Sequence, residues 1–168
     1  MLAFEAHDHG ACVRDHVAAA EAICQARRLR LTPVRRRVLE ILLEEHRALG
    51  AYDVLSRLQA EGLGAHPPVA YRALDFLVVH GFVHKLERLN AFVACSAPAT
   101  ETAGRHRPAF LICRNCDAVA ETDAGPVALA LDGAATEAGF RIEATAVEAE
   151  GLCSACQASG GAHAGPAP

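Results

Sequence analysis

Residues 82–95 read FVHKLERLNAFVAC, and residues 106–116 read HRPAFLICRNC. The first stretch predicts a β-hairpin, with strands at 82–87 and 91–95. The second predicts a strand that ends in a Cys-x-x-Cys pair, and the small and polar residues 96–105 between the two stretches are typical of a linker. Residue types that bind metals are therefore expected on both sides of a junction between two parts of the chain.

The sequence before the hairpin predicts four helices. Thr32 and Pro33 supply an N-cap and a first helical residue, and Gly62 and Gly81 supply helix ends. The apolar spacing then predicts helices over 15–28, from 33 onward, over 52–59 and over 67–80. Helices followed by a hairpin indicate a winged helix-turn-helix domain over residues 13–95, preceded by a flexible tail over residues 1–12.

The fourth predicted helix has a polar outer face. Ala70, Leu74 and Leu77 form its apolar stripe, and at about 100° per residue Arg72 points away from that stripe with Tyr71 beside it. Such a face suits the major groove of DNA. The net charge of −4 argues against a nucleic-acid binder, but residues 27–37 contain six arginines and no acid, a cluster that the average conceals.

The hairpin carries a predicted pair of metal ligands. If its loop is the two residues Leu89 and Asn90, His84 lies directly opposite Cys95, with Cβ atoms about 4.5–5.5 Å apart. This distance allows both side chains to share one zinc ion. The alternative is that both residues pack in the core of the hairpin, and the spacing alone leaves both interpretations open.

The residues after the linker predict a second domain over residues 106–156. Strands are expected at 107–113, 117–123 and 140–148, with a helix between Gly125 and Gly139. This β-β-α-β order indicates a small antiparallel α+β sheet, so the whole chain falls in the α+β class. Residues 157–168 have the composition of a disordered tail.

The seven cysteines predict thiolate-bound metal and not a disulfide framework. No signal peptide precedes them and no apolar run has transmembrane length, so we expect a reducing cytoplasm and no membrane partner. Two Cys-x-x-Cys pairs form the ligand set of a structural zinc site: Cys113, Cys116, Cys153 and Cys156. A thioredoxin-like redox role is the alternative for a single pair, and the presence of two pairs favours zinc.

A second zinc site is predicted from the metal-binding residues that remain. Two imidazoles, one thiolate and one carboxylate suit tetrahedral zinc and disfavour hard cations and a simple iron(II) site: His84, Cys95, His106 and Glu121. Near the N-terminus, His7, His9 and Cys12 could form a further metal site, but a frayed end is the simpler interpretation.

The motifs LTPVRRRVLEIL, AYDVL, PPVAYRALDFLVVHGFVHKLE and FLICRNC, with the distal Cys-x-x-Cys, resemble the ferric-uptake-regulator family. The resemblance covers about residues 18–156. Only His106 remains of the His-rich run that precedes the first Cys pair in iron-type members, and Cys95 ends the hairpin, so the chain resembles the zinc-uptake branch. The resemblance implies that the four paired cysteines hold structural zinc and that the other four ligands sense zinc.

The resemblance also implies a function. The expected protein is a homodimeric repressor, joined through its C-terminal domains, that carries two zinc ions per chain and binds palindromic operators of zinc-uptake genes when zinc is plentiful. Its DNA contacts are expected at four residues: Tyr71, Arg72, Tyr52 and Arg35. The sequence departs from the family motifs at Val34 and at Val69-Ala70, where a hydroxyl is lost at the start of the recognition helix.

Two other functions are alternatives to zinc-dependent repression. An iron or peroxide sensor of the same family would differ in the metal that promotes DNA binding. A zinc hydrolase or deaminase would need an open coordination position and a general-base Glu, but the chain has no H-E-x-x-H motif, and neither Cys pair follows a Pro. We therefore expect no enzymatic activity and no small-molecule substrate other than zinc.

Overall fold

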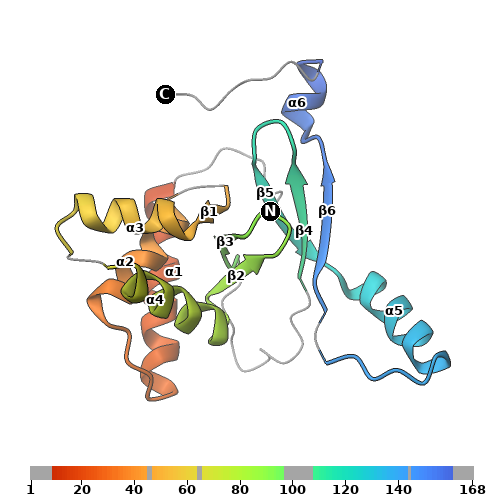
Figure 1. Ribbon diagram of the computed structural model, residues 1–168, viewed down its shortest axis with the longest axis horizontal. Coiled ribbons are helices and arrows are strands. Elements are labelled where there is room, and N and C mark those ends of the chain that lie inside the picture. Colours follow the sequence, from red (N-terminus) through yellow and green to blue (C-terminus); the bar gives the residue numbers. More distant parts are fainter. Residues whose placement is uncertain (1–8, 45–46, 64–65, 97–107, 144, 161–168) are drawn as a thin grey trace. The chain divides into compact units, whose positions relative to one another are not determined.

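Figure 1 shows the computed structural model of the chain, which describes residues 9–44, 47–63, 66–96, 108–143 and 145–160. These residues form two compact units that are divided between Ala103 and Gly104. Within these ranges, no helix is both long enough and apolar enough to cross a membrane.

The N-terminal unit consists of four helices and a three-stranded sheet. Its elements are, in order, α1 His9–Ala26, α2 Pro33–Leu43, β1 Leu49–Gly50, α3 Ala51–Ala60, α4 Pro67–Val79, β2 Val83–Leu86 and β3 Ala91–Ala94. The strands lie in the order β1-β3-β2, with both pairs antiparallel. The helices and the β2–β3 hairpin confirm the predicted winged helix; β1, which is only two residues long, was not predicted.

Helix α1 begins earlier than predicted. Residues 9–12 were expected in a flexible tail, but the helix starts at His9, because no proline stops the Ala-rich helical segment from extending toward the N-terminus. Val17, Ala20 and Cys24 are buried along one side of it. The helix also ends at Ala26, two residues before the predicted end.

Helices α2 and α4 form as their sequences predict. The Oγ1 atom of Thr32 accepts a hydrogen bond from the N–H of Arg35 at 3.4 Å, so Thr32 is the N-cap of α2. Helix α4 begins at Pro67 and is followed by Gly81 at φ 76°, a conformation that glycine adopts without strain. Both helices bury one face in a single core that also contains Phe82 and Phe92 from the sheet.

The hairpin register differs from the prediction by two residues. Leu86 pairs with Ala91 and His84 with Val93, so the loop is the four residues 87–90. A two-residue loop would have required positive φ at Leu89 as well as Asn90, which is costly for Leu; in the observed loop Asn90, at φ 46°, is the residue with positive φ. Because the shift is an even number of residues, every side chain keeps its predicted face of the hairpin.

The C-terminal unit contains the predicted β-β-α-β order and one further helix. Its elements are β4 Pro108–Cys113, β5 Val119–Asp123, α5 Gly125–Glu137, β6 Val147–Gly151 and α6 Ser154–Ala158. The sheet order is β5-β4-β6. Helix α6 covers residues 157 and 158, which were expected in the disordered tail; residues 161–168 lie outside the described ranges.

The third strand of this sheet lies later in the sequence than predicted. Strand β6 begins at Val147 and not at Phe140, and it pairs with β4 in parallel, whereas β4 and β5 are antiparallel as predicted. Strands β5 and β6 lie on opposite sides of β4, so the chain after β5 must cross to the other edge of the sheet. Helix α5 and the segment after it form this long connection. Neighbouring antiparallel strands can be joined by a short turn, but a strand that pairs in parallel must be reached by a long crossover of this kind.

Candidate metal centres

The two Cys-x-x-Cys pairs are brought together by the parallel pairing of β4 and β6. Cys113 is the last residue of β4 and pairs with Gly151, the last residue of β6. The chain turns after Cys113 to reach Cys116, and it continues from Gly151 to Cys153, the N-cap of α6. The two Cys-x-x-Cys pairs are 37 residues or more apart in the sequence. They come together because the C-terminal ends of β4 and β6 lie side by side.

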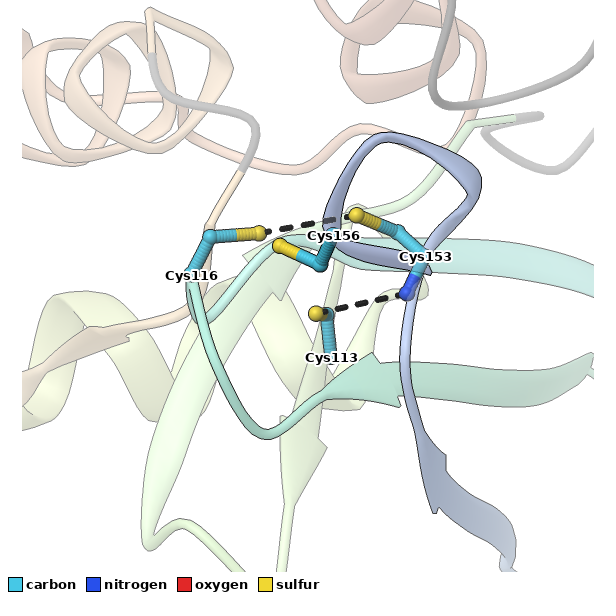
Figure 2. Close-up of side chains that lie close together, drawn as sticks. All are labelled: Cys113, Cys116, Cys153 and Cys156. Carbon is cyan, nitrogen blue, oxygen red and sulfur yellow. Dashed lines mark hydrogen bonds between the residues drawn. The ribbon is translucent and has the colours of Figure 1, made fainter. Parts of the chain in front are cut away.

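The four sulfur atoms form one cluster (Figure 2). They all lie within 4.8 Å of one another, and the Sγ atoms of Cys116 and Cys153 are 3.8 Å apart. A disulfide has sulfur atoms about 2.05 Å apart, so these are free thiols. Four sulfur atoms placed tetrahedrally about 2.3 Å from one zinc ion lie about 3.8 Å from each other. The cluster therefore has the size and the donor chemistry of a structural zinc site.

Hydrogen bonds from within the C-terminal unit orient these sulfur atoms. The backbone N–H of Cys153 donates to the Sγ of Cys113 at 3.3 Å (Figure 2). The Nδ2 atom of Asn115 donates to the Sγ of Cys156 at 3.2 Å, so a side chain of the first pair's turn contacts the second pair. N–H donors stabilise a thiolate more than a thiol, which favours the form that binds metal.

The pKa values of two thiols respond to this arrangement in opposite directions. Burial acts to raise the pKa of Cys113, but backbone N–H groups, including those of Cys153 and Asn115, outweigh it and lower the pKa to about 6. For Cys116, a hydrogen bond from the N–H of Ala118 acts to lower the pKa, but burial and the neighbouring thiols raise it to about 12. Cys113 therefore forms a thiolate readily, whereas Cys116 does not. Four thiolates this close together repel one another, so a cation is required to hold all four cysteines in the deprotonated form.

Within the N-terminal unit, the structure brings together two of the four ligands predicted for the second site. His84 lies in β2 and Cys95 follows β3, and the two offer ligand atoms within 4.8 Å of each other. Cys95 donates its backbone N–H to the carbonyl of Phe82 at 3.0 Å, so it lies diagonally across the hairpin from His84 instead of directly opposite.

The other two predicted ligands belong to the second half of the chain. Glu121 lies in β5 of the C-terminal unit, where it pairs with Phe110 of β4 and is half-buried. His106 and most of the linker lie outside the described residues, as does His7. His9 and Cys12 lie within helix α1.

One contact beside Cys95 was not predicted from the sequence. The Nε2 atom of His16 in α1 lies 3.1 Å from the carbonyl oxygen of Ser96, so Nε2 carries the proton of this hydrogen bond. The contact joins α1 to the residue after Cys95. A histidine within a helix gives no sequence signal for such a contact.

The residues predicted to contact DNA differ in their accessibility. Tyr52 of α3 is 72% exposed, and Tyr71 and Arg72 of α4 are also exposed. The guanidinium of Arg35, by contrast, lies over the ring of Phe76, with Cζ 3.7 Å from the ring centroid. Arg35 also donates from Nη1 to the carbonyl of Arg30 at 2.6 Å, so its side chain holds helix α2 against α4 and against the segment before α2.

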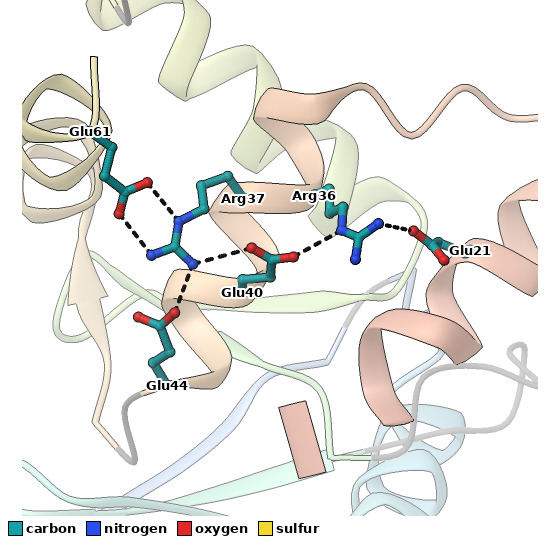
Figure 3. Close-up of polar contacts among 6 residues, drawn as sticks. All are labelled: Glu21, Arg36, Arg37, Glu40, Glu44 and Glu61. Carbon is teal, nitrogen blue, oxygen red and sulfur yellow. Dashed lines mark hydrogen bonds and ion pairs between the residues drawn. The ribbon is translucent and has the colours of Figure 1, made fainter. Parts of the chain in front are cut away.

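Two further arginines of the basic cluster form ion pairs with glutamates (Figure 3). Arg37 donates to Glu61 through Nε and Nη2 at 2.7 Å and to Glu44 through Nη1 at 2.7 Å. Arg36 pairs with Glu21 and, at 2.9 Å, with Glu40. These pairs connect α1, α2 and the end of α3, and they neutralise part of the positive charge seen in the sequence.

Known proteins resemble this chain over most of its length. Residues 26–150 match the ferric uptake regulator family. The zinc uptake regulation protein of Escherichia coli (strain K12) is 42% identical over 140 residues, which are 83% of this chain and 80% of that protein.

Two solved structures are also similar. A zinc uptake regulator complexed with zinc and DNA is 39% identical, with a TM-score of 0.81 over 89% of this chain and 97% of that chain. The crystal structure of holo XcZur is 41% identical, with a TM-score of 0.77 over 86% and 98% of the two chains. The sequence and the fold thus agree, and the chain belongs to the ferric uptake regulator family.

Proposed function

We propose that this protein is a zinc-responsive transcriptional repressor that binds palindromic operators of zinc-uptake genes as a zinc-loaded homodimer. The observation that carries this proposal is the 42% identity, over 83% of the chain, to a zinc uptake regulation protein. The similarity to a zinc uptake regulator complexed with zinc and DNA supports it. The protein is therefore a regulator and not an enzyme, and it acts on chromosomal DNA in the cytoplasm.

The first of two proposed zinc ions per chain has a structural role. Its ligands are the four cysteines whose sulfur atoms lie within 4.8 Å of one another: Cys113, Cys116, Cys153 and Cys156. Zinc bound there would join the ends of β4 and β6 through its coordination bonds to the four thiolates. Among the described residues, Ala118 and Leu152 are partly buried against this cluster, so the link adds to a small apolar contact at this end of the sheet.

The second proposed zinc ion has a regulatory role. His84 and Cys95 supply two ligands from the hairpin, and the proximity of their ligand atoms supports this assignment. His106 and Glu121 supply the other two from the C-terminal half of the chain. The proposed boundaries place a DNA-binding domain at 13–95, a hinge linker at 96–105 and a dimerisation domain at 106–156, so this site has ligands on both sides of the hinge.

The DNA contacts are proposed to come from α4 and the start of α3. Tyr71, Arg72 and Tyr52 are exposed on these helices and can reach base edges or phosphates. In a two-fold dimer the recognition helices enter successive major grooves when they are about 34–36 Å apart. To shift the competent arrangement from about 1% to 99% of the population, zinc must favour it by about 5.5 kcal/mol.

Recovery of genomic DNA by the purified protein tests this function. We expect the protein to enrich fragments with palindromic sequences near zinc-uptake genes when zinc is present and to enrich none when zinc is chelated. The same experiment with iron(II) under anaerobic conditions separates the zinc regulator from an iron sensor. Enrichment that depends on iron and not on zinc would overturn the assignment.

A further inference from the structure

Helix α1 ends in a backbone conformation that its sequence does not favour. Arg28 has φ 55°, in the left-handed region, and two hydrogen bonds fix it there: Arg28 N–H to Gln25 O at 3.2 Å and Leu29 N–H to Cys24 O at 2.8 Å. This is the pattern of a helix that ends with a left-handed residue. An L-residue with a long side chain is strained in this region.

The other helix ends show which residues this chain normally uses there. Glycines at positive φ follow α3, α4, α5 and α6: Gly62, Gly81, Gly139 and Gly160. Within the described residues, the non-glycine residues at positive φ are Asn90, Asp117 and Arg28. Asn and Asp adopt the left-handed region several-fold more often than other residues with a side chain, whereas Arg has no such preference. Strain retained at one position is often compensated by a function of the side chain.

The side chain of Arg28 is positioned to offer its charge to an external partner. Arg28 is exposed, and its guanidinium forms no ion pair with any residue that the structure describes. In the same basic cluster, Arg36 and Arg37 are paired with glutamates (Figure 3). The strained residue is therefore one whose positive charge the fold does not neutralise.

The segment that carries Arg28 is held beside the proposed recognition helix. Arg35 binds the carbonyl of Arg30 at 2.6 Å and stacks on Phe76 of α4. Phe76 is four residues after Arg72, so the two lie on the same side of α4. Arg35 thus connects the loop between α1 and α2 to the side of α4 that presents Arg72.

We propose that Arg28 contacts a phosphate of the DNA backbone next to the groove that α4 enters, an inference that rests on the proposed DNA binding. Phosphates attract an exposed guanidinium irrespective of base sequence, and each such contact releases counterions. Arg28 therefore contributes to affinity on every duplex and to base selection on none.

The test uses the zinc-loaded full-length protein and a 30-base-pair duplex that the wild-type protein has selected from a random pool. Arg28→Asn removes the charge and relieves the strain, Arg28→Gln removes the charge at similar length, and Arg28→Lys keeps the charge. For the first two variants we expect the plot of log K against log salt to be less steep by about 0.9 per chain, which corresponds to about an eightfold loss per contact at 0.1 M salt. Arg28→Lys should retain most of the wild-type slope.

Two controls make the result decisive. Arg141→Gln removes one exposed arginine from the C-terminal unit and should leave the slope unchanged. Arg28→Asn should melt at or above the wild-type temperature, because it relieves the backbone strain. If it melts below that temperature, the salt dependence of Arg28→Gln is used to judge the phosphate contact. If both neutral variants keep the wild-type slope, whether or not they bind the duplex more weakly, the phosphate contact is overturned. Failure of the wild-type protein to bind any selected duplex would instead overturn the proposed function.

Discussion

At the residue scale, the pair His84 and Cys95 shows what a sequence pattern can and cannot predict. The proximity of the two side chains was predicted correctly, although the register on which the prediction was based was wrong by two residues. A register shift of an even number of residues leaves each side chain on the same face of the hairpin. The sequence could therefore predict that His84 and Cys95 share a face, but not whether they lie directly opposite each other. His16 and Ser96 meet through a contact between distant residues that no local pattern encodes.

Replacement of Cys95 tests its assignment as a regulatory ligand. Cys95→Ser should leave a folded dimer whose DNA binding no longer tightens when zinc is added, because a hydroxyl is a much weaker zinc ligand than a thiolate. A gel-shift titration with zinc measures the response. Cys24→Ala is the control, since Cys24 is a buried cysteine of the N-terminal core that belongs to neither proposed site, and this variant should keep the zinc response. An undiminished response in Cys95→Ser would show that Cys95 is not a ligand.

Asn115 is a second residue whose role follows from one contact. Asn115→Ala removes the N–H that the side chain donates to the sulfur of Cys156, and we expect release of the structural zinc to a competing chelator to become roughly tenfold faster. Arg114→Ala, in the same turn, alters an exposed side chain and should release zinc at the wild-type rate. Equal release rates in the two variants would remove Asn115 from the support of the site.

At the element scale, helices were predicted better than strands. Thr32, Pro33 and the glycines after α3, α4 and α5 mark helix ends through local chemistry, so the sequence contains the signal. Strand β6 was misplaced because its partner, β4, lies far away in the sequence and pairs with it in parallel. Strand β1 was missed because two residues are too few for an alternating pattern.

The ion pairs of Arg37 should stabilise the packing of α2 against α3. Arg37 is only 25% exposed and binds Glu61 through two nitrogen atoms, so Arg37→Gln should lower the free energy of unfolding by about 1–2 kcal/mol. Arg36→Gln, at a 51% exposed position where solvent screens the ion pairs, should lower it by clearly less. Urea denaturation measures both, and equal losses would contradict the ranking.

The same pairs predict a pH dependence. The hydrogen bond from Arg37 lowers the pKa of Glu61 below its usual value. A carboxylate with a depressed pKa stabilises the fold above its unfolded pKa of about 4.3, and this contribution is lost as the pH falls through the folded pKa. The difference in stability between wild type and Arg37→Gln should therefore shrink below about pH 4; a constant difference from pH 7 to pH 3 would exclude Glu61 as the partner that matters.

At the scale of the whole molecule, the division into two units agrees with the change in composition along the chain. Residues 1–98 carry 12 Lys or Arg and 11 Asp or Glu, and residues 99–168 carry 4 and 9, so the basic residues gather in the N-terminal unit. The N-terminal unit has one apolar core built from four helices and the sheet, whereas a buried cluster of the C-terminal unit contains three cysteines. The two units should therefore differ in how strongly their stability depends on zinc.

Loss of the structural zinc should affect only the C-terminal unit. Cys113→Ser should abolish dimerisation and expose the amides of β4 and β6 to hydrogen exchange, while α2 and α4 remain protected by their own core. Sedimentation and hydrogen exchange give the two measurements. A Cys113→Ser protein that is still dimeric, with β4 protected, would refute a structural role for the four-cysteine site.

The most direct test of the central claim is a titration of the full-length protein with zinc while its affinity for a selected operator duplex is followed by fluorescence anisotropy. If only about 1% of the protein without regulatory zinc has the competent arrangement, saturating zinc should tighten binding by about 100-fold. Iron(II) under anaerobic conditions should not reproduce this gain. An affinity that is the same with and without zinc, or that tightens with iron(II) alone, would contradict the account.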